Sequence, residues 1–222
     1  MYSTPQNKNV LQMALNTLSI KSLPGLANTI YSLLCRIIIS METYSGTRQK
    51  YKPKKIKFLL IAESPPPAAD IQSSRHFYRT DRVRVDDRLF VNTMKALYPE
   101  TADLKESELE ANKETWLKKF QSDGWYMIEA LEESQVHEVT KKQRQALIKD
   151  SLPQIIERVG KLANKDTRII LIKSNVFDIA AEPLKAAGFN VLNKKLLDYP
   201  GRYNQSAYRE KLEKLLDSAY TR

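Results

Sequence analysis

"KFLLIAESPPPAAD", residues 57–70, is the most informative stretch of this sequence. Its apolar run does not alternate with polar residues, and this pattern predicts a β-strand over residues 56–62 that is buried on both faces. The three prolines that follow fix φ and carry no backbone N–H, so the strand must end there in a stiff loop. Glu63 therefore stands where a buried strand stops, on a segment that cannot continue a sheet.

Apolar patterns along the rest of the chain predict helices that alternate with three more strands. The further strands are expected at residues 125–130, 167–174 and 189–193. The helices are expected at residues 10–20, 26–41, 86–98, 107–120, 140–162, 176–187 and 206–220. Thr140 and Gln143 form a capping-box pattern, and Pro153 should break or kink the helix that they open. Gly188 is expected to end the helix that precedes it.

Strands that alternate with helices of this length are typical of βαβ units. The sequence therefore predicts an α/β protein, a three-layer α/β/α sandwich with a central, mostly parallel four-stranded sheet. Because the 222 residues contain no repeat and no internal linker, residues 1–222 are expected to form a single domain. Residues 56–222 would be its α/β core. Residues 1–45 would be a helical extension that either forms a small cap or packs on the sheet.

The chain is basic, with 36 Lys and Arg against 26 Asp and Glu and a formal net charge of +10. Such an excess favours a polyanionic partner, with nucleic acid first and an acidic membrane surface second. The alternative is a basic protein whose charge is spread evenly over its surface. The oligomeric state stays open.

The cysteine content points to a reducing compartment. Cys35 is the only cysteine, so the chain has neither an internal disulfide nor a metal site built from several thiolates. The N-terminal "MYSTPQNKNV" shows no secretory pattern, and a cytoplasmic protein is expected. The most apolar stretch, residues 29–41, is too short to span a bilayer and contains Arg36.

Ligands of open α/β sheets bind beyond the carboxyl ends of the strands, and three polar signals stand at such ends. Glu63 either faces a water or substrate, or caps a helix or pairs with a nearby arginine. Glu129, at the end of "GWYMIE", is either an exposed strand end or a site residue. The third signal is "DYPGRYNQ", residues 198–205, which either offers backbone N–H groups to an anion or is a plain turn with a helix cap.

The long loop after Glu63 is a further candidate. It interleaves arginines with aromatic side chains: Arg75, His76, Phe77, Tyr78, Arg79, Arg82 and Arg84. Guanidinium groups beside rings suit phosphate contact and base stacking, whereas the alternative is a solvated basic loop. Neither His76 nor His137 has a second histidine nearby, so no metal site is expected. The sequence contains no G-x-G-x-x-G, P-loop or G-x-S-x-G motif.

Together these signals resemble the uracil-DNA glycosylase superfamily, which has a three-layer α/β fold with a mostly parallel four-stranded sheet. The first motif of that family follows the first core strand, in forms such as G-E-x-P-G. Here "IAESPPP" has Glu63 and Pro65 at the matching positions, whereas Ala62 and Pro66 replace the glycines. The resemblance implies that Glu63 activates or orients the attacking water and that Ser64 and Pro65 contact the nucleobase.

The later motifs depart further from the family. In the family, an aromatic residue that stacks on the flipped base follows the first motif along the chain. Phe77, or else Tyr78, stands at about that separation from Glu63 in the sequence. "GWYMIE" resembles the middle motif G-V-F-L-L-N, with Glu129 in place of the base-reading asparagine. The last motif, H-P-S, corresponds to Tyr199, Pro200 and Gly201. The resemblance thus implies that a tyrosine hydroxyl replaces the histidine donor to the departing base.

The resemblance covers residues 56–222 and implies DNA binding and excision of a damaged or deaminated base by N-glycosidic hydrolysis, without metal or organic cofactor. The implied DNA contacts are Arg75, Arg79, Tyr199, Pro200, Gly201, Arg202 and Asn204. A carboxylate accepts hydrogen bonds only, so Glu129 would select a base that presents N–H donors or would work protonated. A catalytically silent nucleic-acid binder, an enzyme acting on a small phosphorylated substrate and a protein–protein module stay open as alternatives.

Overall fold

The computed structural model describes residues 46–65, 76–80, 87–133 and 139–220. By compactness the chain divides into Met1–Thr43 and Tyr44–Arg222, and every described residue belongs to the second unit. The helices expected at residues 10–20 and 26–41, and the N-terminal extension that contains them, lie outside the described residues. So do three of the arginines of the long loop, Arg75, Arg82 and Arg84.

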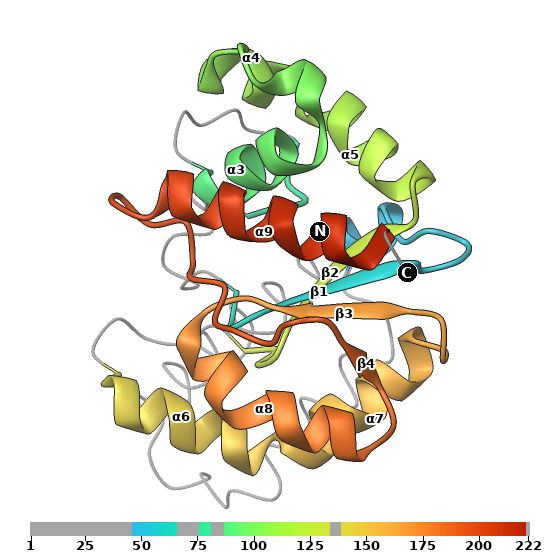
Figure 1. Cartoon of the computed structure of the whole chain (residues 1–222), viewed down its shortest axis with the longest axis vertical. Coiled ribbons are helices and arrows are strands. Elements are labelled where there is room, and N and C mark those ends of the chain that lie inside the picture. The colour runs from blue at the N-terminus through green and yellow to red at the C-terminus, as the bar shows by residue number, and fades with distance from the viewer. Residues whose placement is uncertain (1–45, 66–75, 81–86, 134–138, 221–222) are drawn as a thin grey trace, which may run out of the picture. The chain divides into compact units, whose positions relative to one another are not determined.

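The four expected strands form one sheet, all parallel, in the order β2-β1-β3-β4 (Figure 1). They are β1 (Phe58–Ala62), β2 (Trp125–Glu129), β3 (Arg168–Leu171) and β4 (Asn190–Val191). β1 lies in the middle and all five of its residues are buried, so the prediction of a strand covered on both faces is confirmed. In the register, Ala62 of β1 lies opposite Glu129, and Ile61 lies opposite Leu171.

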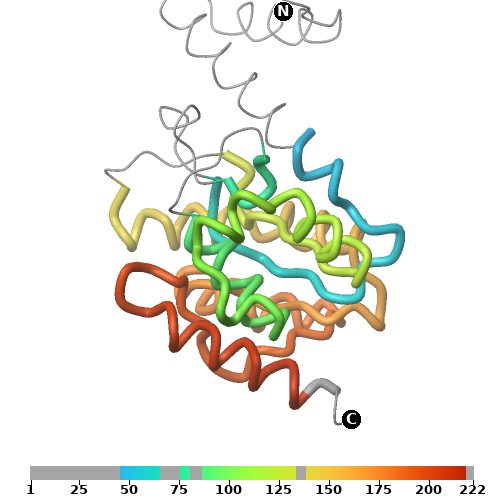
Figure 2. The backbone as a smooth tube through the Cα atoms, turned by 90° about the horizontal axis from the view of Figure 1, so that it is seen from above, coloured from blue at the N-terminus to red at the C-terminus, as the bar shows by residue number. Residues whose placement is uncertain are grey.

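Helices flank this sheet, with α3, α4, α5 and α9 on one side and α6, α7 and α8 on the other (Figure 1). Their bounds are α3 (Arg88–Leu97), α4 (Glu106–Ala111), α5 (Lys113–Ser122), α6 (Lys141–Asp150), α7 (Leu152–Leu162), α8 (Ser174–Ala186) and α9 (Gln205–Tyr220), with a short 3-10 turn η3 (Pro99–Thr101) after α3. α3 and α9 pack against each other, as Figure 2 shows from above. The expected α/β class is therefore confirmed.

Two expected helices are each divided in two. The pattern over residues 107–120 is split at Asn112, where the backbone leaves the helical region with φ of −102° and ψ of 21° and the side-chain amide donates to the Glu108 carbonyl. The pattern over residues 140–162 is split at Ser151, between α6 and α7. Pro153 lies in the first turn of α7, where its missing N–H costs no helical hydrogen bond. The capping box of Thr140 and Gln143 is present, as expected.

One turn requires glycine on steric grounds. Gly124 precedes β2 with φ of +89°, and a Cβ at this position would lie 2.7 Å from Lys57 Cγ. The Gly124 carbonyl accepts from the backbone N–H groups of Lys57 and Phe58, which sets the register at the start of β1. No helix in the described part of the chain is long and apolar enough to cross a membrane.

Candidate functional site

The strand order locates the candidate site. The chain leaves β1 for β2 on one side, then crosses to β3 on the other, so the direction of winding reverses between β1 and β3. In open parallel sheets such a switch point opens a crevice at the carboxyl ends of the two strands. Glu63 directly follows β1, and Lys173 comes two residues after the end of β3. Both residues therefore stand at the switch point.

Glu63 is buried there, with 5% of its surface exposed, and it has two partners. Asn175 Nδ2 donates to Glu63 Oε1 over 2.8 Å. Lys173 Nζ forms an ion pair with Glu63 Oε2, and the Lys173 side chain is 37% exposed. The Lys173 side chain therefore lies partly at the surface, while its ammonium is paired with the buried carboxylate.

The backbone at Lys173 is strained. Its φ is +79°, and no other non-glycine residue in the described part of the chain has a positive φ. A side chain in this region costs about 1–3 kcal/mol, and residues that carry such strain cluster at functional sites. The Lys173 N–H donates to the Leu197 carbonyl over 2.8 Å, and Lys173 is also the N-cap of α8. These two connections hold the residue in its unfavourable conformation.

Asn175 contributes a buried acceptor without a partner. The residue is 3% exposed and lies in the first turn of α8. Because a carboxylate only accepts hydrogen bonds, the amide nitrogen must face Glu63, and this fixes the direction of the amide. Asn175 Oδ1 is then buried with no hydrogen-bond partner among the described residues. The site thus offers an acceptor to a donor that a water or ligand would bring.

Ser64 and Pro65 follow Glu63 and end the described part of the proline loop; Ser64 is half-buried and Pro65 is buried. The "DYPGRYNQ" stretch begins at the carboxyl ends of the strands, since Leu197, which precedes it, pairs with Ile172 in a parallel bridge. The structure therefore brings Glu63, Ser64 and Pro65 to the same end of the sheet as the start of this stretch. Lys173, which the sequence analysis did not single out, links the two, because it pairs with Glu63 and its N–H donates to the Leu197 carbonyl.

The turn itself projects from the molecule before α9. Pro200 is buried and Gly201 half-buried, and the Gly201 N–H donates to the Tyr199 carbonyl over 2.7 Å. Tyr199 is 40% exposed, Tyr203 is 88% exposed, and the Arg202 guanidinium lies 5.7 Å from the centre of the Tyr203 ring. The turn thus presents an exposed aromatic ring with a cation stacked on it. Asn204 follows, exposed, at the start of α9, where its carbonyl accepts from the Tyr208 N–H.

Glu129 is also buried, with 6% of its surface exposed, and burial raises the pKa of its carboxyl group. Its Oε2 accepts from Arg48 Nη1 over 2.9 Å, and its carbonyl accepts from Arg158 Nη1 over 3.1 Å. Glu132, half-exposed, lies beside both arginines. The predicted base-reading carboxylate therefore has an ion-pair partner already, an arginine far away in the sequence.

Phe77 and Tyr78 belong to the core. Phe77 is 3% exposed and makes edge contacts with Phe90 and Tyr78, and Tyr78 is 0% exposed. The Tyr78 hydroxyl accepts from the Met127 N–H over 2.6 Å, which ties residues 76–80 to β2. In this structure neither ring offers a face to a base. Arg79 is half-buried, and its N–H donates to the His76 carbonyl.

Metal ligands do not gather in the described part of the chain: no group of three His, Cys, Asp or Glu residues there could hold an ion. No protein-family model matches the sequence, no curated protein matches it significantly, and no solved structure matches its fold significantly. The geometry of the site therefore has to carry the functional conclusion.

Proposed function

We propose that this chain is a nucleic-acid-binding protein with a uracil-DNA glycosylase-like fold, and that Glu63 orients a water for hydrolysis of an N-glycosidic bond. The observation that carries the proposal is the arrangement at the switch point. A buried carboxylate, a strained lysine and an amide oxygen without a partner meet where parallel sheets bind ligands. Buried polar groups that are incompletely satisfied are expected at functional sites.

The chemistry assigns a role to each group. Glu63 accepts the proton of the attacking water, whose oxygen bonds to C1′ of the sugar as the bond from C1′ to the base nitrogen breaks. The electron pair of that bond leaves with the base, which then takes up a proton. Negative charge on Glu63 also stabilises the cationic character of the sugar in the transition state. Asn175 Oδ1 accepts from an N–H of the base or from the water.

Lys173 connects binding to this chemistry. In the free protein its ammonium neutralises Glu63. A nucleotide phosphate that reached this ammonium would compete with Glu63 for it and would release the carboxylate toward the water. The lysine would then be a positioning residue, acting through Glu63.

The charge of the chain and the turn before α9 support a nucleic-acid partner. The net charge of +10 attracts phosphates, and this attraction weakens as salt rises. Tyr203, with Arg202 on its ring, presents a surface on which a base can stack. The Tyr199 hydroxyl is the candidate donor to the departing base.

A catalytically silent binder is the second candidate, and two observations favour it. Phe77 and Tyr78 are packed in the core, so the expected stacking platform is not presented. Glu63 and Glu129 both hold ion-pair partners. In this alternative the two carboxylates stabilise the fold, and the basic surface alone binds nucleic acid.

A base-release assay separates the two candidates. Oligonucleotides that carry uracil, hypoxanthine or xanthine are incubated with the wild type and with Glu63→Gln, which preserves the shape of the side chain. Glu132→Gln is the matched control, because it removes the same charge from a side chain that is 50% exposed. Release by the wild type and by Glu132→Gln, but not by Glu63→Gln, supports hydrolysis. Salt-sensitive binding by all three proteins without release of any base supports the silent binder.

A further inference from the structure

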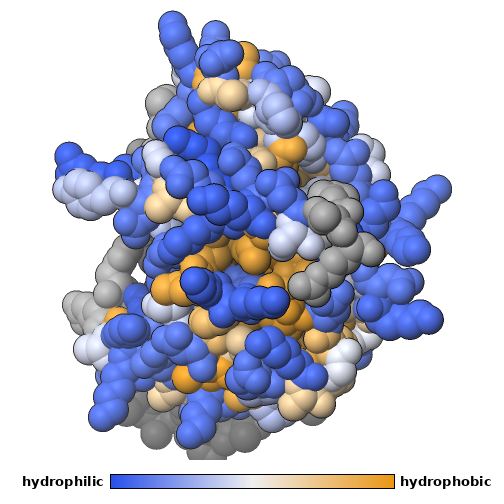
Figure 3. Space-filling model, in the orientation of Figure 1, coloured by the Kyte–Doolittle hydropathy of each residue, from blue (hydrophilic) through white to orange (hydrophobic). Residues whose placement is uncertain are grey.

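A cavity lies toward the β4 edge of the sheet, between α9 and the segment that follows β4. Its volume is about 800 Å³. Five of the residues that line it are cations, namely Arg168, Lys194, Lys195, Lys211 and Lys214. Three more are apolar, namely Leu192, Leu196 and Leu215. Figure 3 shows this face, with hydrophobic side chains in a hollow below α9 and hydrophilic side chains around them.

The charge of the cavity wall is one-sided, because no acidic residue lines it. Asp198 pairs with Lys211 over 2.7 Å from outside the lining. No carboxylate of the described residues pairs with Lys194, Lys195 or Lys214, all three of which are exposed. Like charges around one cavity repel each other, and a bound anion relieves that repulsion.

The leucines indicate that the anion has an apolar part. Leu192 and Leu215 are half-buried and pack against the main core, so their remaining surface forms an apolar floor. A cavity of this volume is within the range of small-molecule sites, and it is far larger than one phosphate ion requires. A ligand that filled it would bury apolar surface against the leucines while its charge met the lysines.

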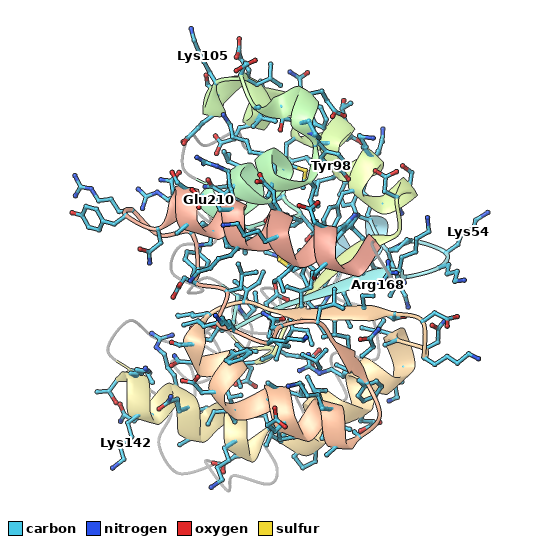
Figure 4. All side chains as sticks on the ribbon, in the orientation of Figure 1. Lys54, Tyr98, Lys105, Lys142, Arg168 and Glu210 are labelled. Atoms are coloured by element: carbon cyan, nitrogen blue, oxygen red, sulfur yellow. The ribbon has the colours of Figure 1, made fainter. Side chains whose placement is uncertain are left out.

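We propose that this cavity binds a small organic phosphate. The phosphate lies among Lys194, Lys195 and Lys214, and its apolar body lies against the leucine floor. The site is distinct from the one at Glu63, since Arg168 begins β3 whereas Lys173 follows its end. Figure 4 shows Arg168 near the sheet below α9.

Calorimetric titration with defined probes tests the proposal. The probes are hexyl phosphate, a nucleoside monophosphate, inorganic phosphate and hexanol. Hexyl phosphate or the nucleoside monophosphate should bind at least tenfold more tightly than inorganic phosphate or hexanol, on the order expected when charge and apolar burial act together. Comparison of the two organic phosphates then distinguishes an aliphatic body from a nucleobase.

Variants locate the site. The double variant Lys194→Gln/Lys195→Gln should weaken binding by about tenfold, since two exposed cations are lost. Lys142→Gln is the control, because Lys142 is an exposed lysine of α6, on the other side of the sheet (Figure 4). Ser218→Trp should block the cavity from the exposed face of α9, where the substitution disturbs no core contact.

Three results would overturn the proposal. One is equal loss of binding in the double variant and in Lys142→Gln. Another is inorganic phosphate binding as tightly as both organic phosphates. The third is binding of oligonucleotides or anionic vesicles only, with neither small phosphate bound. None of these readouts depends on base release, so the outcome is independent of the activity proposed for Glu63.

Discussion

Replacement of Lys173 should be costlier than replacement of its partner Glu63. The two ends of this ion pair differ in burial, since the Glu63 side chain is 4% exposed and that of Lys173 is 37% exposed. In Glu63→Gln, the lysine loses its partner but reaches water. In Lys173→Gln, the carboxylate stays buried without a cation, with Asn175 as its remaining donor.

The magnitudes follow from this asymmetry. Breaking a fully buried pair costs about 3–5 kcal/mol, and an exposed pair contributes about 1 kcal/mol or less. Lys173→Gln lies between these limits, and we expect it to lower the free energy of unfolding by about 2 kcal/mol. Glu63→Gln should cost about 1 kcal/mol or less. The double variant should then resemble Glu63→Gln, because no buried charge is left without a partner.

A third variant separates charge from backbone strain. Lys173→Gly also removes the cation, but glycine adopts φ of +79° without a steric penalty. It should therefore be about 1 kcal/mol more stable than Lys173→Gln. Urea denaturation of the four variants and the wild type, compared at equal m-values, measures each cost. The reasoning is refuted if Lys173→Gln costs no more stability than Glu63→Gln, or if Lys173→Gly is less stable than Lys173→Gln.

Three further predictions concern other parts of the molecule. Burial lowers the pKa of His76 to about 3 from 6.5, so the folded state binds its proton later than the unfolded chain as pH falls. The free energy of unfolding should drop as pH falls from 6.5 toward 3, by about 2 kcal/mol at pH 5. In His76→Gln, urea denaturation at several pH values should show a free energy of unfolding that lacks this contribution to the pH dependence. Gly124→Ala should cost about 2 kcal/mol or more in thermal unfolding, because strain adds to the clash with Lys57, whereas Gly188→Ala, at φ of +88° in open space, should cost only about 1 kcal/mol. Tyr203→Ala should leave stability unchanged and weaken single-stranded oligonucleotide binding by about 1–3 kcal/mol in fluorescence anisotropy, and unchanged binding would exclude the ring from the interface.

The α/β class could be predicted because hydrophobic periodicity reports burial. The unbroken apolar run of β1 indicated a strand covered on both faces, and the triple proline marked its end. The order of strands in the sheet had no such signal, since pairing joins residues far apart in the chain. The division at Asn112 was also missed, because the apolar pattern continues across this residue while its backbone leaves the helical region.

The candidate site could be predicted only in part. Glu63 was found because a carboxylate stood between a buried strand and prolines. The same rule applied to "IILIKSN" indicates Lys173 and Asn175, which follow β3 as Glu63 follows β1. The ion pair of Glu129 with Arg48 joins residues 81 positions apart, which no local pattern shows. Burial of Tyr78 likewise depends on its contact with β2.

The central position of β1 has a consequence for synthesis of the chain. β1 is the first strand of the sheet to leave the ribosome, yet both of its partners lie far downstream. Until β2 is made, an apolar strand with two open edges is exposed to other nascent chains. Lysines in "KPKKIK" precede it and the prolines of "SPPP" follow it, and both kinds of residue oppose intermolecular strand pairing. The lysines and prolines that flank β1 are therefore expected to limit aggregation of the growing polypeptide before the sheet can form.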